Sequence, residues 1–173
     1  MRYDLRPGLR RGPVFFHDMT NPETFNPALL TVEPLVRADL PQVLAIEQAS
    51  FKQPWTREGF ETELDRAPAI SLTLKDGREI HGYLVFWLIA DEMHILNIAV
   101  RPDLRKKGLG GILLEYLTAF AREVGVVRIF LEVRRSNVAA QALYRSAGFE
   151  FAGERKNYYA EDHEDALMMT LSL

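Results

Sequence analysis

Residues 100–111 have the sequence Val100-Arg101-Pro102-Asp103-Leu104-Arg105-Lys106-Lys107-Gly108-Leu109-Gly110-Gly111. The apolar run before them ends at the proline, which has no amide proton to continue a β ladder. Glycines then lead into a segment of helical periodicity, so the pattern predicts a strand, a loop and the start of a helix. The stretch carries four basic side chains against one acidic side chain, a net charge of +3. Free backbone amides at a helix start, beside this charge, indicate a site for an anion such as phosphate.

The chain after this stretch alternates between helical and strand patterns. From Leu109, apolar side chains recur at i, i+3, i+4, i+7, i+8, i+11 and i+15, which predicts a helix that Gly125 ends. Residues 126–133 are an apolar run rich in β-branched residues, typical of a central strand with both faces covered. A second helix is expected from about residue 137 to 147, followed by Gly148 as a C-terminal cap.

Further strands are expected on both flanks, over residues 30–34, 70–74, 80–88, 93–100, 149–159 and 166–171. The second and third of these bracket an Asp76-Gly77 turn and therefore predict a hairpin. Asp39 and Thr56 are the expected caps of two helices in the first half. This order predicts an α/β (α+β) fold, in which a mixed sheet has helices on its faces. It argues against a purely parallel sheet.

The composition is that of one globular domain. The chain has 173 residues, of which 47% are hydrophobic and 26% charged, which excludes disordered and collagen-like classes. The absence of cysteine excludes disulfides, zinc–thiolate sites and a cysteine nucleophile, and fits a reducing cytosol. Residues 1–31 interleave arginine with proline and glycine without any period. We expect them to be an irregular N-terminal extension of a domain over residues 32–173.

Charge and hydropathy restrict the partners. The net charge of −3 argues against a non-specific nucleic-acid binder. No run approaches the roughly 18 apolar residues that a membrane helix needs, and the first residues lack the apolar region of a signal peptide. We therefore expect a cytoplasmic protein, a monomer or weak dimer, without a membrane partner. The four histidines, at 17, 81, 94 and 163, show no paired ligand spacing, so no metal is expected.

Three kinds of phosphate loop compete for residues 105–110. A Walker A loop needs Gly-Lys followed by Ser or Thr, which this stretch lacks. The dinucleotide fingerprint needs a third glycine where Leu113 stands. The remaining pattern, Arg105-x-x-Gly108-x-Gly110, resembles the pyrophosphate-binding signature of the GNAT superfamily of acetyl-CoA-dependent N-acetyltransferases.

The resemblance extends downstream to a subfamily. Residues 131–144, Leu-Glu-Val-Arg-Arg-Ser-Asn-Val-Ala-Ala-Gln-Ala-Leu-Tyr, and Gly148-Phe149 are similar to the RimI-type ribosomal-protein-alanine N-acetyltransferases. So are Arg155-Lys156-Asn157-Tyr158-Tyr159 and the acidic turn after them. The resemblance covers roughly residues 32–173. It implies a GNAT-like fold: a mixed, mostly antiparallel, twisted sheet, flanked by helices and splayed where acetyl-CoA binds.

The resemblance also implies which residues bind acetyl-CoA. The strand before the loop contacts the pantetheine arm through its backbone, the loop and helix start bind the pyrophosphate, and Asn137 hydrogen-bonds the pantetheine arm. A helix cap is the alternative role of Asn137. The expected coenzyme-binding residues are Ile98, Ala99, Val100, Arg105, Lys106, Lys107, Gly108, Leu109, Gly110, Gly111, Asn137 and Tyr144.

Amide formation from a thioester requires a neutral amine and a proton for the departing thiolate. By resemblance, Glu132 is the general base, acting directly or through water, and Tyr144 protonates the sulfur of coenzyme A. The alternatives are a salt bridge of Glu132 with Arg134 and a purely structural, core tyrosine at 144. Without cysteine there is no acetyl-cysteine intermediate, so direct transfer is the simpler route.

The acceptor is expected to be a peptide N-terminus. An α-amine titrates near 7.8 and lysine near 10.4, so at neutral pH lysine needs roughly 3.5 kcal/mol more to lose its proton. Phe51, Trp55, Tyr158 and Tyr159 are candidates for the peptide wall, although aromatic residues are also common in cores. The resemblance implies the N-terminal alanine of a basic small-subunit ribosomal protein. A broader N-terminal or lysine acetyltransferase and a non-catalytic acyl-CoA-binding regulator remain alternatives.

Overall fold

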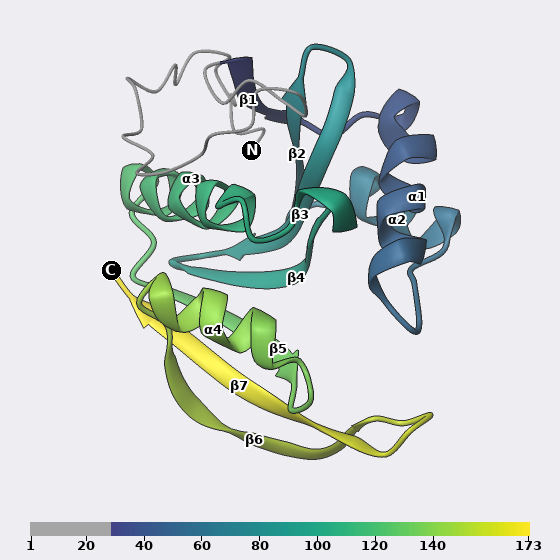
Figure 1. Ribbon diagram of the computed structural model, residues 1–173. Coiled ribbons are helices and arrows are strands. Elements are labelled where there is room, and N and C mark those ends of the chain that lie inside the picture. The colour runs from purple at the N-terminus through teal and green to yellow at the C-terminus, as the bar shows by residue number, and fades with distance from the viewer. Residues whose placement is uncertain (1–28) are drawn as a thin grey trace.

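The computed structural model describes residues 29–173, which form a seven-stranded sheet with helices on both faces (Figure 1). The strand order is β1-β2-β3-β4-β5-β7-β6. β4 and β5 pair in parallel and the other neighbours pair antiparallel, so the expected mixed, mostly antiparallel sheet is confirmed. The strands are β1 (Leu30–Pro34), β2 (Ala69–Asp76), β3 (Glu79–Ile89), β4 (Glu92–Val100), β5 (Arg128–Arg134), β6 (Glu150–Tyr159) and β7 (Glu164–Ser172).

Four α-helices connect these strands. They are α1 (Leu40–Ser50), α2 (Arg57–Asp65), α3 (Leu109–Glu123) and α4 (Val138–Ser146), with short 3-10 helices η2 (Arg37–Asp39) and η3 (Pro102–Leu104). α3 is the crossover that lets β4 and β5 run parallel, since parallel neighbours cannot be joined by a tight turn. The chain then returns through α4 and the β6–β7 hairpin, and β7 pairs with β5.

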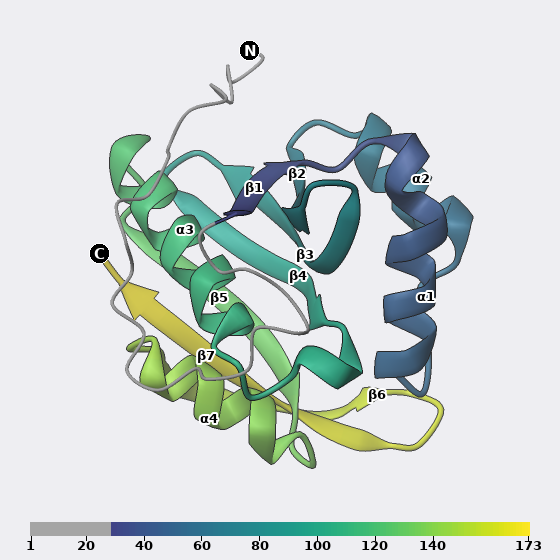
Figure 2. The same cartoon turned by 45° about the horizontal axis from the view of Figure 1, so that its top comes forward.

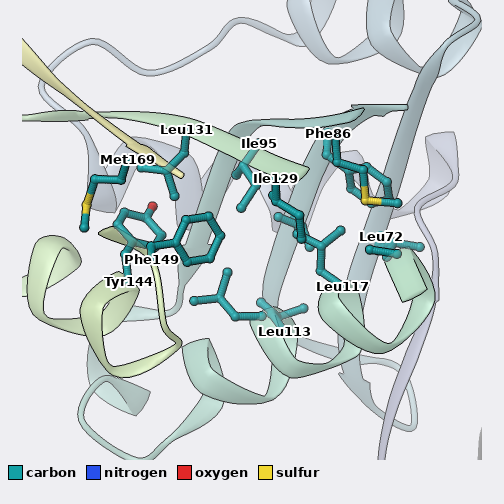
Figure 3. Packing of buried hydrophobic residues seen from close by; sticks show 14 of the residues in the cluster. Leu72, Phe86, Ile95, Leu113, Leu117, Ile129, Leu131, Tyr144, Phe149 and Met169 are labelled. Carbon is teal, nitrogen blue, oxygen red and sulfur yellow. The ribbon is translucent and has the colours of Figure 1, made fainter. Parts of the chain in front are cut away.

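Alternation along the strands divides the interior into two clusters. In β3, Leu84 and Phe86 pack with the apolar side chains of α3, whereas Tyr83 and Val85 pack with α1 and α2. The cluster under α3 and α4 is the larger one and contains the apolar stripe predicted for residues 109–124. Figure 3 shows its side chains meeting between the helices and the sheet. The sheet thus presents one face to α3 and α4 and the other to α1 and α2.

Two of the three expected N-terminal helix caps are confirmed. The Thr56 hydroxyl accepts the amide of Gly59 at 3.2 Å, and the Asn137 side chain accepts the amide of Ala140 at 3.1 Å. Asp39 precedes α1 but makes no side-chain cap. Its carboxylate instead accepts from the Val36 amide and from Lys75, both at 3.0 Å. The prediction that Asp39 caps α1 was wrong, because its carboxylate pairs with the Lys75 ammonium group from β2.

The expected extension, residues 1–31, lies outside the described part of the chain except for its last three residues. Of these, Leu30 and Thr31 already belong to β1 and pair with β2. Within residues 29–173, no helix combines the length and apolar character needed to cross a membrane.

Candidate active site

β4 and β5 separate where the site is expected. Their parallel pairing ends at Ile95 and Leu131, although β4 continues to Val100 and β5 to Arg134. A β-bulge coincides with the separation, since β3 pairs Phe86 with Ile95 but Val85 with Asn97, which leaves Leu96 as the extra residue. Beyond the bulge, the edge of β4 that faces β5 has no ladder partner among the described strands. The backbone groups on this edge at residues 96–99 are therefore open to a ligand, while the Val100 carbonyl accepts from Arg105.

The loop after β4 presents the start of α3 to the same opening. Lys106 and Gly108 have positive φ angles of 61° and 78°, which turn the chain sharply into the helix. The first amide bonded back into the helix is that of Ile112, which donates to the carbonyl of Gly108 at 3.1 Å. The amides of residues 109–111 precede it and have no intrahelical acceptor. This arrangement is suited to binding an anion through the main chain.

The absence of a side chain has a different consequence at each of the three glycines of the loop. Gly108 has a left-handed conformation, which costs other residues roughly 1–2 kcal/mol. A Cβ on Gly110 would lie 2.9 Å from Cδ2 of Leu143, so glycine lets α3 and α4 pack closely. A Cβ on Gly111 would meet nothing within 4 Å. Space is thus left above the helix start, where the coenzyme's pyrophosphate is expected.

The basic side chains of the loop divide into paired and unpaired groups. Arg101 forms salt bridges with Glu79 and, at 2.8 Å, with Asp103, and hydrogen bonding to Asp103 is the first cause that raises the pKa of Arg101. Arg105 donates to the Val100 carbonyl at 3.2 Å and to the Ser50 hydroxyl at 2.8 Å. It therefore braces the loop against the end of α1 while its charge stays without an acidic partner among the described residues. Lys106 is exposed.

Tyr144 lies on α4 and points into the apolar cluster between this helix and the sheet. Its side chain is only 6% exposed and packs with the apolar cluster of α3, and its ring centre lies 5.9 Å from that of Phe149. Figure 3 shows the hydroxyl on the side of Leu131 and Met169. Burial, with a smaller contribution from Tyr159, raises the pKa of the hydroxyl, which therefore keeps its proton. Within residues 29–173 it has no hydrogen-bond partner and remains available as a donor.

Glu132 follows the last residue of β5 that pairs with β4, and it points to the other face of the sheet. Its neighbours Leu131 and Val133 belong to the cluster that contains Tyr144, so alternation directs Glu132 toward the face of α1 and α2. Its carboxylate lies 3.4 Å from the guanidinium of Arg155, and both side chains are partly exposed. The expected alternative, a salt bridge with Arg134, is wrong because Arg134 pairs with other carboxylates.

A cluster that we call the Arg134 clasp consists of Arg134, Gln53, Tyr159, Asp162 and Glu164. The guanidinium donates to Asp162 at 2.9 Å, to Glu164 at 2.8 Å and to the Gln53 amide oxygen at 3.2 Å. It also lies 3.8 Å from the ring centre of Tyr159. The clasp joins the loop between α1 and α2 to the β6–β7 hairpin, whose tip lies beside the end of α1 (Figure 2).

The four aromatic residues expected at the peptide wall lie on these same two segments. Phe51 and Trp55 are half-buried in the loop between α1 and α2, where Trp55 packs 5.3 Å from Phe60. Tyr158 and Tyr159 end β6, with ring centres 5.2 Å apart. Burial raises the pKa of Tyr159 to about 12. The structure thus gathers all four at the end of the sheet where Arg134 lies.

Glu47 is a site residue that the sequence analysis did not identify. It is 1% exposed, on α1, and its carboxyl group is hydrogen-bonded to Tyr83, Asn97 and the Trp55 amide. A detectable signal existed, because Glu47 lies four residues after buried Val43 and thus on the apolar face of its helix. No group of three or more His, Cys, Asp or Glu side chains in residues 29–173 is arranged to hold a metal ion.

Comparisons with known proteins agree with this geometry. The profile of the "Acetyltransferase (GNAT) family" matches residues 40–149. The [ribosomal protein bS18]-alanine N-acetyltransferase of Salmonella typhimurium is 40% identical over 146 residues, which cover 83% of this chain and 97% of that protein. The crystal structure of the ribosomal-protein-S18-alanine N-acetyltransferase from Escherichia coli superposes with a TM-score of 0.76 at 37% identity, covering 83% of this chain and 93% of that one.

A structure solved with acetyl-CoA shares the fold as well. It is a GNAT family acetyltransferase from Elizabethkingia anophelis, with a TM-score of 0.69 and 20% identity over 84% of this chain and 99% of that one. The resemblance inferred from residues 105–110 and 131–149 is confirmed by the family profile, which spans both segments. The separated strands, the glycine loop and the matched profile together lead to one conclusion: the chain belongs to the acetyltransferase (GNAT) family.

Proposed function

We propose that this protein transfers the acetyl group of acetyl-CoA to the N-terminal alanine of a small-subunit ribosomal protein. The observation that carries the proposal is the 40% identity with the Salmonella enzyme over 97% of that enzyme's length. Such an acceptor places the reaction in the cytoplasm, where ribosomal proteins are made. The catalytic and binding roles given below are part of the proposal.

The coenzyme occupies the side of the sheet that carries α3 and α4. Its pyrophosphate is held by the amides of Leu109, Gly110 and Gly111, with Arg105, Lys106 and Lys107 supplying positive charge. The open space above Gly111 supports this placement. The pantetheine arm runs along the free edge of β4 at residues 98–100, and the thioester enters the separation between β4 and β5. Asn137 caps α4 and, by resemblance, also contacts the pantetheine arm.

The reaction is a direct transfer. Glu132 takes a proton from the ammonium group of the acceptor, and the neutral amine attacks the thioester carbonyl to form the new C–N bond. The C–S bond then breaks, and the thiolate takes the proton of the Tyr144 hydroxyl. The new amide nitrogen releases its extra proton, which passes through water to the Tyr144 phenolate and restores the hydroxyl. Because Glu132 and Tyr144 lie on opposite faces of the sheet, the amine and the departing sulfur are served from opposite sides.

The acceptor peptide enters between the loop of residues 51–56 and the β6–β7 hairpin. Phe51, Trp55, Tyr158 and Tyr159 form its wall, and the Arg134 clasp holds the two segments together. Three carboxylates of the 161–165 turn already have cationic partners: Asp162 and Glu164 pair with Arg134, and Asp165 with Lys156. Recognition of the first residue therefore depends more on the shape of this opening than on attraction of a basic tail.

Mass spectrometry after incubation with acetyl-CoA tests the proposal. The substrate is a peptide with the N-terminal sequence of a bacterial bS18 protein, and the matched control is the same peptide with a blocked N-terminus and free lysines. We expect acetylation of the free N-terminus only. Lysine acetylation in the blocked peptide would instead indicate a broader acetyltransferase. Binding of acetyl-CoA without transfer to either peptide would favour an acyl-CoA-binding regulator.

A further inference from the structure

A single buried residue, Glu47, holds both ends of the loop between α1 and α2. Its backbone carbonyl accepts the amide of Phe51 at 3.1 Å, and its side chain accepts the amide of Trp55 at 2.7 Å. The two residues held in this way are the aromatic pair that the proposed function places at the peptide wall. Only the second bond involves the side chain, so the Trp55 end of the loop depends on where the Glu47 carboxyl group is fixed.

The Glu47 carboxyl is fixed by a ring of three side chains from three different elements. Tyr83 of β3 makes a short hydrogen bond with Oε2 of Glu47, and its hydroxyl lies 3.2 Å from Oδ1 of Asn97 on β4. The ring closes through Nδ2 of Asn97, which lies 3.2 and 3.3 Å from the two carboxyl oxygens of Glu47. Tyr83 is fully buried and Asn97 is 8% exposed, so water does not replace these bonds.

Counting hydrogens shows which form of Glu47 closes this ring. The ring has three contacts, and each needs one hydrogen. The Tyr83 hydroxyl supplies one, and the Asn97 side chain supplies one from its nitrogen, because its oxygen faces the other ring partner. The third hydrogen must come from Glu47. Reversing the Asn97 amide does not change the count, because its oxygen would then face Glu47 and again require a proton there. A neutral Glu47 satisfies every member of the ring.

The surroundings of Glu47 agree with a neutral carboxyl. No salt bridge joins Glu47 to a cation within residues 29–173, and the groups that face it from the loop, β3 and β4 are a backbone amide, a phenol and a carboxamide. Burying a charged carboxylate without a cation is costly, and the neutral form avoids that cost. Burial likewise raises the pKa of Glu47 above its ordinary value.

Asn97 connects this ring to the expected site of reaction. It follows the bulge residue Leu96, at the point where β4 leaves β5, and the bulge directs both side chains to the face of α1. We propose that Glu47, in its protonated form, is a positioning residue that fixes the loop between α1 and α2 relative to the free edge of β4. The consequence for catalysis, though not the hydrogen-bonded ring, rests on the proposed function, which places the acceptor at this loop.

Three variants test the proposal by steady-state kinetics. Glu47→Leu removes the ring and the bond to Trp55, and should raise the KM for the Ala-peptide about tenfold while leaving the KM for acetyl-CoA within about twofold. Glu47→Gln supplies the missing hydrogen from its amide and should restore the acceptor KM to within about twofold of the unmodified protein. If Glu47→Gln is as defective as Glu47→Leu, a charged carboxylate is needed and the proposal is overturned.

Glu63→Leu is the matched control for general loss of stability. Glu63 is also a buried glutamate on a helix, α2, and accepts a hydrogen bond from Nε1 of Trp87 on β3 at 2.7 Å. Within residues 29–173 its side chain forms no hydrogen bond or salt bridge with the loop between α1 and α2 or with β4. We expect it to lose stability in urea without a change in acceptor KM. Equal rises in acceptor KM for Glu47→Leu and Glu63→Leu would overturn the positioning role.

Amide hydrogen exchange provides a readout that needs no acceptor. Residues 51–55 should exchange faster in Glu47→Leu but not in Glu47→Gln or Glu63→Leu. Unchanged exchange in Glu47→Leu would overturn the proposal even if the protein acetylates the Ala-peptide. If no transfer to that peptide occurs in the unmodified protein, the proposed function fails, but faster exchange in Glu47→Leu alone would still support the hydrogen-bonded ring and its hold on the loop.

Discussion

The two faces of the sheet are built from different kinds of interaction. Under α3 and α4 the interior is an apolar cluster, and the expected coenzyme contacts come from backbone groups at the start of α3 and the edge of β4. Under α1 and α2 the smaller cluster contains the buried polar side chains of Glu47, Tyr83 and Asn97. In the proposed function, one face therefore binds the coenzyme through main-chain geometry, and the other sets its shape through side-chain hydrogen bonds.

This difference decides how each face tolerates substitution. Main-chain contacts depend on glycine and on helix geometry, so they are insensitive to most side-chain changes and sensitive to an added Cβ. A buried polar network is sensitive to removal of any one member, because its partners are then left unsatisfied. The following substitutions probe the contrast, beginning with the two groups that act from opposite faces.

Glu132→Gln should have the largest effect, since it removes the proposed base. We expect turnover to fall by about 10²- to 10⁴-fold and the pH profile of the rate to change, with little change in acetyl-CoA affinity. Stopped-time assays over a range of pH values measure this. Glu150→Gln, an exposed carboxylate at the start of β6, is the control. An unchanged pH profile would leave Glu132 as a salt-bridge partner of Arg155.

Tyr144→Phe comes next and tests the face of α3 and α4. The hydroxyl has no hydrogen-bond partner in the described chain, so its removal should leave stability nearly unchanged. Turnover should fall about 10²-fold while acetyl-CoA binding, followed by calorimetry, changes little. Tyr116→Phe, a half-buried tyrosine on α3, is the control. Equal loss of turnover and of binding would mean that Tyr144 only packs.

Gly108→Ala and Gly111→Ala separate backbone conformation from backbone access. The first places alanine at a φ of 78° and should cost roughly 1–2 kcal/mol of unfolding free energy. The second adds a methyl group to open space in a helix, so stability should be unchanged or rise by up to about 1 kcal/mol. Acetyl-CoA affinity in Gly111→Ala should nevertheless fall about tenfold. Unchanged affinity would contradict phosphate binding at this helix start.

The smallest effect concerns pH and the face of α1 and α2. The folded-state pKa of Glu47 is raised, so its contribution to stability is present at low pH and is lost as pH rises from the ordinary carboxyl pKa through the folded one. Glu47→Gln cannot lose a proton. Its stability relative to the unmodified protein should therefore rise with pH, by at most about 1.4 kcal/mol per pH unit. Urea unfolding at several pH values measures the difference, and a constant difference would contradict it.

The same contrast explains which features could be predicted from the sequence. The element order, the loop before α3 and the caps at Thr56 and Asn137 follow from local patterns, and the structure confirms them. The roles of Glu132 and Tyr144 came from resemblance and stay predictions. Asp39 failed as a cap because its partner, Lys75, lies 36 residues away. The Arg134 clasp and the Glu47 ring join residues up to 81 and 50 positions apart, which no local pattern encodes.

The bulge at Leu96 means that β4 contains one residue more than regular pairing with β3 would need. Side chains alternate between the faces of a strand, so one residue more or less reverses every later position. Deleting one residue between Ile95 and Asn97 would remove the bulge, realign β4 with β5 and still keep Asn97 opposite Val85. The opening between the strands would then be closed by ordinary sheet pairing. A single extra residue in β4 thus lies at the point where the sheet stops being continuous.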